Sequence, residues 1–106
     1  MALTVTAGSI RQEGPVFFTP VSVAFDSSYP NDGSSGGESL DYETYIPGGS
    51  DGILLGAVVQ GEDGYFFDYN STVKKIRAFV ESTGAQVADT TDLSALTAVE
   101  VLFISA

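Results

Sequence analysis

The chain has 106 residues, a formal net charge of −10, and neither cysteine nor histidine. Its 14 acidic against 4 basic residues oppose binding to nucleic acid or to an anionic membrane, because such binding needs Lys and Arg to neutralise phosphates. Without Cys and His there is no disulfide, no thiolate or imidazole metal site, and no base of near-neutral pKa for a catalytic triad. We therefore expect no enzyme, no cofactor, no nucleic acid and no membrane partner.

The N-terminal segment MALTVTAGSI has no basic region and too short an apolar run for a secretory signal. No apolar run in the chain approaches the roughly 18 residues of a membrane span. We therefore expect synthesis in the cytoplasm of the producing cell. The length suits one modest hydrophobic core, so residues 1–106 are predicted to form a single domain.

The first quarter of the chain predicts strands separated by a proline. Residues 3–6 alternate apolar and β-branched polar side chains, which predicts a short strand at the edge or start of a sheet. Residues 21–26 alternate as a half-buried strand, with Val21, Val23 and Phe25 toward the core. Because Pro20 cannot donate to a ladder, we expect residues 16–19 to form an edge strand, or to be offset by a bulge from the strand that follows.

Two turn-rich segments follow. Residues 26–37 contain nearly every turn-forming residue type and no repeated apolar spacing, which predicts a long exposed loop. We expect residues 27–37 of this loop to be mobile in the free protein. Leu40, Tyr42 and Ile46 are candidates for packing against the core. A second turn cluster occupies residues 47–52.

Residues 53–80 contain three strand-forming runs joined by turns at 61–64 and 70–71, which predicts a three-stranded antiparallel meander. Its alternation places Asp68 opposite a cation of the next strand. The other face of the meander is predicted to be the main core face, formed by Leu54, Gly56, Val58, Tyr65, Phe67, Tyr69, Ile76, Ala78 and Val80.

The strand at 53–59 is apolar on its second face too, where Ile53, Leu55, Ala57 and Val59 lie. A strand of this kind is normally covered on both sides, so either this chain or another must cover it.

The C-terminal part predicts one short helical turn and a last strand. Residues 91–96 offer a cap residue followed by helix-compatible residues. In residues 97–104, Val99, Val101 and Phe103 alternate with a second, largely apolar set. The whole pattern predicts an all-β, antiparallel, jelly-roll-like sandwich with a central meander and one helical turn.

Acidic side chains are the only candidates left for chemistry. Such residues in turns are far more often solvated than catalytic, so a small acidic hydrolase is the weakest interpretation of the pairs Asp41 with Glu43, Glu62 with Asp63, and Asp89 with Asp92. Oxygen ligands at 31–33 and 50–52 would suit calcium, but their spacing is not that of an EF-hand loop. We expect no metal site.

Three stretches carry a family resemblance: VAFDSSYP at 23–30 with GGE at 36–38, GYFFDY at 64–69 with KKI at 74–76, and TDLSALT at 91–97. In this order they resemble small structural proteins of tailed-bacteriophage virions, of the decoration or capsid-cement kind. The resemblance implies a non-enzymatic role on the virion. The chain departs from the family pattern at residues 31–35, which separate Tyr-Pro from Gly-Gly-Glu, and at 41–44, so no contact of this loop is carried over.

The resemblance leads us to expect a protein that decorates the outer surface of a phage capsid and bridges subunits of the major capsid protein. The acidic charge favours the outer side, because the inner side of the shell faces packed DNA. The alternative is a head-fibre or tail module that binds a host-surface glycan. Exposed aromatic side chains within residues 29–46 would favour that alternative.

The apolar second faces of the strands at 53–59 and 99–104 predict a homo-oligomer, either a dimer or a trimer. The competing explanation is a cover formed by residues 84–96 of the same chain. The residues expected to contact a partner or a second copy are Ile53, Leu55, Val59, Leu102, Ile104, Tyr29, Tyr42 and Tyr45.

Overall fold

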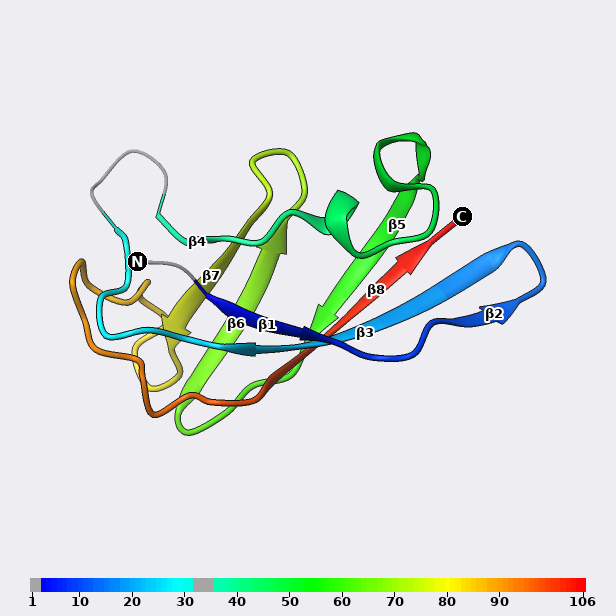
Figure 1. Ribbon diagram of the computed structural model, residues 1–106. Coiled ribbons are helices and arrows are strands. Elements are labelled where there is room, and N and C mark those ends of the chain that lie inside the picture. The colour runs from blue at the N-terminus through cyan, green and yellow to red at the C-terminus, as the bar shows by residue number, and fades with distance from the viewer. Residues whose placement is uncertain (1–2, 32–35) are drawn as a thin grey trace.

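The computed structural model of the protein describes residues 3–31 and 36–106. Two antiparallel β-sheets pack against each other, and two lone 3₁₀ turns lie between the strands (Figure 1). The all-β sandwich predicted from the sequence is confirmed.

The larger sheet has five strands among the described residues. Its order is β1-β3-β8-β5, and β2 pairs with β3 beyond the end of β1. The bounds are β1 Thr4–Ala7, β2 Arg11–Glu13, β3 Val16–Ala24, β5 Leu54–Val59 and β8 Val99–Ser105. The β2–β3 hairpin and the C-terminus lie at the same end of the molecule (Figure 1).

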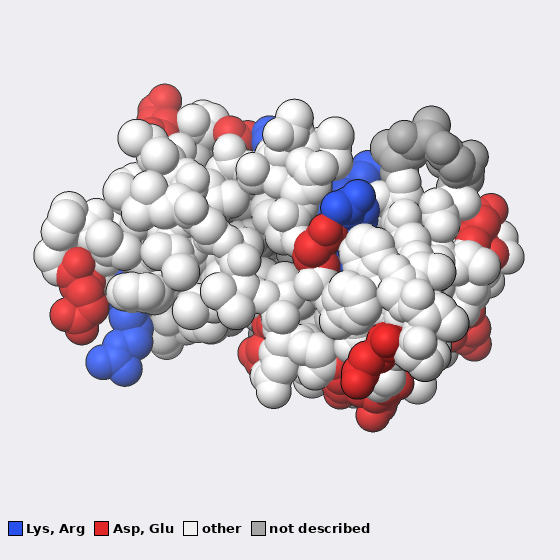
Figure 2. Space-filling model, turned by 180° about the vertical axis from the view of Figure 1, so that it is seen from behind, with Lys and Arg blue, Asp and Glu red and all other residues white. Residues whose placement is uncertain are grey.

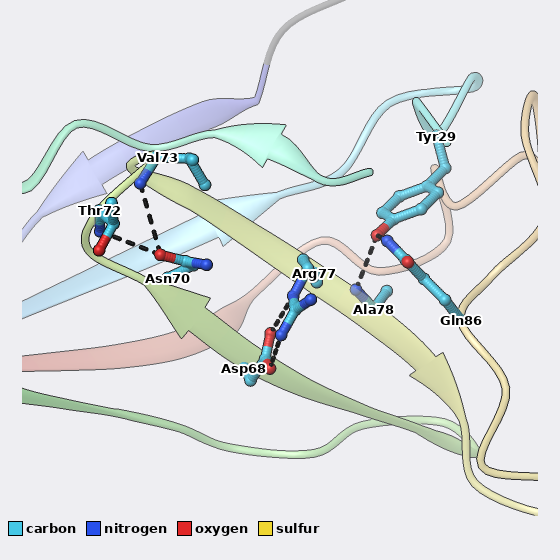
Figure 3. A network of polar contacts seen from close by, with 8 residues as sticks. All are labelled: Tyr29, Asp68, Asn70, Thr72, Val73, Arg77, Ala78 and Gln86. Atoms are coloured by element: carbon cyan, nitrogen blue, oxygen red, sulfur yellow. Dashed lines mark hydrogen bonds and ion pairs between the residues drawn. The ribbon is translucent and has the colours of Figure 1, made fainter. Parts of the chain in front are cut away.

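The smaller sheet has the order β4-β7-β6. Its bounds are β4 Glu38–Ser39, β6 Tyr65–Asn70 and β7 Lys75–Val80, and the 3₁₀ turns are η1 Tyr42–Thr44 and η2 Gly49–Asp51. Phe67 is paired with Ala78 and Asp68 with Arg77, which is the predicted register of these two strands. The predicted cross-strand ion pair is confirmed, because the Arg77 guanidinium donates twice to the Asp68 carboxylate, at 2.8 and 2.5 Å (Figure 3).

The core lies between the sheets. The stacked rings of Phe25 and Phe67, 5.4 Å apart, and the edge-to-face contact of Tyr69 with Phe103, at 5.2 Å, join the two layers. Segments outside the strands complete it. The other buried apolar residues are Val21, Val23, Tyr29, Leu40, Ile46, Ile76, Ala78, Val87, Leu93, Leu96, Val99 and Val101.

Pro20 does not interrupt its strand, contrary to the expectation of an edge strand or a bulge. β3 runs unbroken through it and pairs with β8 on one side. The carbonyl of Pro20 accepts from the N–H of Gly8 at 2.8 Å, so it points away from β8. The N and C=O of one residue in an antiparallel strand point to the same side, so the N–H that proline lacks would also have pointed away from β8. The proline therefore costs no hydrogen bond to β8. A Cβ on Gly8 would lie 2.9 Å from the proline ring, which requires glycine there.

The predicted three-stranded meander is wrong in one pairing. Glu62 and Tyr65 exchange backbone hydrogen bonds of 3.0 Å around Asp63 and Gly64, both at positive φ, as a tight hairpin turn requires. The chain then diverges, and β5 pairs with β8 in the larger sheet while β6 pairs with β7 in the smaller one. The hairpin thus connects two layers.

A β-bulge in β5 changes which side chains face the core. Leu54 is opposite Ser105 and Gly56 is opposite Ile104, so Leu55 is the extra residue. Beyond the bulge, Ala57 and Val59 face the core and Val58 faces outward. The predicted core side was therefore wrong for Gly56 and Val58, and the predicted outer side was wrong for Ala57 and Val59.

The predicted helical turn at 91–96 is also wrong. This segment forms a hydrogen-bonded turn, in which Leu96 N–H donates to Leu93 O at 2.9 Å and the Asp92 carboxylate accepts from Ser94 N–H at 2.9 Å. The 3₁₀ turns lie instead at η1 and η2. Asp41 caps η1 by accepting from the N–H of Glu43.

The loop at 26–37 is not exposed throughout. Tyr29 is fully buried, and its hydroxyl accepts from Ala78 N–H at 3.0 Å and from the Gln86 side chain at 2.8 Å (Figure 3). Its backbone also bonds to residues 90 and 91. The predicted mobility of residues 27–37 concerns in part residues 32–35, which lie outside the described residues.

Candidate interaction surface

The outer face of the larger sheet is apolar over half its length. Cross-strand pairing places Phe18, Ile104 and Gly56 in one row and Pro20, Leu102 and Val58 in the next. Ile53 and the bulged Leu55 extend this surface along the start of β5. We call it the apolar outer face, and it consists of Phe18, Pro20, Ile53, Leu55, Val58, Leu102 and Ile104.

Three members of this face, all on or next to β5, are exposed to an extent that is unusual for large apolar side chains. Ile53 is 63% exposed, Leu55 57% and Val58 59%. Leu102 and Ile104 are half-buried beside them. Contiguous exposed apolar side chains on a charged protein make this face the candidate interaction surface.

A shallow hollow lies on the same face beside Val58. Pro20 and Leu102 form its apolar wall, and Gln60 and Glu100 form its polar margin. The next row of the face, with Ser22 opposite Glu100, is polar. The apolar outer face therefore ends at Gln60 and Glu100, and continues toward the C-terminal end of β8.

Four of the eight predicted contact residues meet on this face: Ile53, Leu55, Leu102 and Ile104. Val59 does not, because the bulge turns it into the core, and Val58 takes its place. Glycine inside a strand often marks a bulge, and a bulge reverses the alternation of the residues that follow it. Gly56 could therefore have indicated that Val58 faces outward. Residues 84–96 do not cover Ile53 or Leu55, since Val87, Leu93 and Leu96 pack in the core instead.

The three predicted tyrosines lie elsewhere. Tyr29 is buried and therefore cannot contact a partner, which corrects that prediction. Tyr42 and Tyr45 are half-buried and pack against the core. The Tyr42 ring meets Tyr69 edge-on at 6.4 Å, and the ammonium of Lys74 lies 5.9 Å from its centre.

Several acidic residues considered for catalysis have structural partners. Lys74 Nζ is 2.8 Å from Glu43 Oε1 and 4.0 Å from Asp41 Oδ1. Asp89 accepts from the backbone N–H of Asn31 at 2.8 Å, and Asp92 closes the turn described above. On the face shown in Figure 2, acidic groups lie mostly along the margin, and a broad uncharged area occupies much of the rest.

One acidic pair contains a buried carboxyl group, Glu38, next to the half-buried Asp26. Glu38 is 2% exposed, and its Oε2 and the Oδ2 of Asp26 have no hydrogen-bond partner among the described residues. Burial, and then the charge of Asp26, raise the pKa of Glu38 to about 7. Within the described ranges, no group of three or more acidic side chains is arranged to hold a metal ion.

No protein-family model, curated sequence or solved structure matches the chain at a significant level. Among the residues with described coordinates, no helix has the length and hydropathy needed to cross a membrane.

Proposed function

We propose that the protein is a structural component of a tailed-phage virion, made in the host cytoplasm, that decorates the outer surface of the capsid. There it reinforces contacts between subunits of the major capsid protein. The observation that carries the proposal is the apolar outer face, which is exposed on a chain of net charge −10. The sequence resemblance to decoration proteins supports the same role.

Burial of the exposed side chains of this face would contribute favourable free energy to docking. Burying a Val, Leu or Ile side chain that was exposed contributes about 1.5–3 kcal/mol before the costs of association. Ile53, Leu55 and Val58 are each more than half exposed, and Leu102 and Ile104 adjoin them. The face is therefore suited to dock on a capsid subunit.

The charge supports the outer side of the shell. A chain with 14 acidic and 4 basic residues is repelled by the DNA inside a capsid, whereas the outer surface imposes no such cost. Two of the cations, Lys74 and Arg77, are engaged by Glu43 and Asp68. The remaining surface is strongly acidic, which also keeps free copies soluble before assembly.

The proposal is tested by adding the purified protein to capsids that lack it and measuring co-sedimentation. The wild type should bind, and Leu55→Glu should weaken binding at least tenfold, because it places a charge in the buried contact. Val73→Glu is the matched control: Val73 is 46% exposed in the β6–β7 turn, and the variant should bind as the wild type does. Wild-type protein that stays in the supernatant, or Leu55→Glu that binds normally, would contradict the proposal.

A second candidate, a module that binds a host-surface glycan, is favoured by one observation. Phe66 is 41% exposed, stacks on Phe79 at 5.1 Å, and lies on the same face as the Asp68–Arg77 pair. Exposed aromatic rings beside fixed polar groups suit sugar rings. A glycan array decides for this candidate if one sugar class binds the wild type and Phe66→Ala abolishes that binding.

A further inference from the structure

The outer edge of β5 has backbone groups with no hydrogen-bond partner among the described residues. Gln60 N–H donates to Glu100 O at 3.0 Å, and Ile53 and Ala106 exchange both backbone bonds, so these residues face β8. Residues along an antiparallel strand alternate in the side to which their N–H and C=O point. Ala57 and Val59 therefore direct these groups away from β8, and no described strand pairs with β5 on that side.

This edge lacks the usual protection against pairing with another strand. Natural edge strands are typically interrupted by proline or carry charged side chains, above all lysine. From Ile53 to Gln60 the chain has neither, and Leu55 and Val58 expose apolar side chains next to the free backbone groups. The bulge at Leu55 interrupts the edge only at one end of the strand. The edge thus offers unpaired N–H and C=O groups together with an adjoining apolar surface.

We propose that two copies of the chain pair antiparallel through β5, about a two-fold axis that places Val58 opposite the partner's Val58. In this register Ala57 of each copy pairs with the partner's Val59, so the free N–H and C=O groups of both strands become hydrogen-bonded. The pairing needs only groups that each copy already presents, as an isologous contact requires. It goes beyond the proposed function and does not depend on it.

A two-fold axis of this kind is perpendicular to the sheet, so both apolar outer faces lie on the same side of the dimer. The two five-stranded sheets become continuous, and Leu102 and Ile104 of each copy remain available on that side. Such a dimer would present two equivalent docking faces to two capsid subunits.

The charges around the strand give this dimer a distinctive salt dependence. Asp51 precedes β5, and Glu62 and Asp63 follow it. Antiparallel pairing brings the acidic residue at one end of each strand toward the acidic residues at the other end of the partner's strand. Added salt screens this repulsion, since the Debye length is about 10 Å at 0.1 M ionic strength, so the dimer should tighten as salt rises. Docking on a basic partner would instead weaken with salt.

The test is sedimentation equilibrium of the free protein at low and high sodium chloride. The wild type should dimerise, with a dissociation constant that falls as salt is raised. Val58→Lys should raise the dissociation constant at least tenfold, because it places two ammonium groups opposite each other at the axis. Val73→Lys changes the charge equally at an exposed valine outside the edge and should behave as the wild type.

A second variant distinguishes strand pairing from stacking of the apolar faces. Ala57→Pro removes a donor that points away from β8 and leaves every side chain of the apolar outer face in place. If circular dichroism shows that Ala57→Pro is folded, the variant should be monomeric. If it does not fold, the dissociation constant of Val58→Lys tests the pairing instead. A wild type that remains monomeric at high salt, or a folded Ala57→Pro that dimerises normally, overturns the inference. Capsid binding is measured separately, so its loss would bear on the proposed function alone.

Discussion

Tyr29 anchors a segment whose composition predicts an exposed loop. Its ring is fully buried, and its hydroxyl satisfies the backbone N–H of Ala78 and the side chain of Gln86. Buried polar groups in native proteins are nearly always paired, and here one phenol serves two donors from other parts of the chain. Turn-forming neighbours determine local backbone preference, but only the partners at 78 and 86 determine that this residue points inward.

Glu38 makes the stability of the fold depend on pH. Its pKa is about 7 in the folded protein, against 4.5 for an unperturbed glutamate, because burial and the neighbouring Asp26 disfavour its charge. Between these values the folded state holds a proton that the unfolded state has lost, so the free energy of unfolding should fall as pH rises from 4.5 to about 7 and then level off. The loss should be on the order of 3 kcal/mol, from a shift of about 2.5 pKa units at about 1.4 kcal/mol per unit.

Urea unfolding at several pH values measures this effect. Glu38→Gln is always neutral, so it should remove the fall and be more stable than the wild type above pH 7. Glu81→Gln, at an exposed position, should leave the wild-type profile in place. A Glu38→Gln profile that parallels the wild type would show that another group is responsible.

β6 has two faces with different roles, and its two adjacent phenylalanines separate them. Phe67 is 8% exposed and stacks on Phe25 across the core, while Phe66 is 41% exposed on the outer face. Phe67→Ala should cost about 3–5 kcal/mol, which is most of the stability of a domain of this size. Phe66→Ala should cost only about 0.5–1.5 kcal/mol, the typical value of an aromatic pair. Soluble expression followed by chemical denaturation compares them, and equal costs would contradict the assignment of faces.

β5 shows how one inserted residue changes an element. Alternation alone places Val58 with Leu54 on the core face, and the extra residue Leu55 reverses this for everything that follows. The strand LLGAVV is apolar at every position except its glycine. Either set of alternating residues could therefore face the core without burying a polar side chain. The hydrogen bonds to β8 select the phase, and with it the residues available to a partner.

The charge of the whole molecule opposes its compact state. With 14 acidic and 4 basic residues, like charges are held closer together in the folded chain than in the unfolded one. Sodium chloride should therefore raise the melting temperature at neutral pH, most steeply below about 0.1 M, where screening changes fastest. Calorimetry at a dilute protein concentration tests this without self-association. Near the isoelectric point of about 4.1 the net repulsion vanishes, and the salt effect should vanish with it.

The sequence by itself determined the all-β class, the register of β6 with β7 and the inward face of β8. In each case an alternating pattern is bounded by turn residues, and these are local properties that any tertiary arrangement must satisfy. Asp68 opposite Arg77, and Val99, Val101 and Phe103 in the core, follow directly from such patterns.

Only the tertiary structure decided which strand β5 joins, where its bulge lies, and that Tyr29 is buried while Val58 is exposed. A strand that is apolar on both faces can pair in either layer and in either phase, and its choice depends on contacts with β8, more than 40 residues away. The same long-range choice leaves one edge of β5 unpaired and the apolar outer face uncovered. The exposure of the apolar outer face therefore results from the strand's pairing, because the residues of β5 are equally compatible with a core.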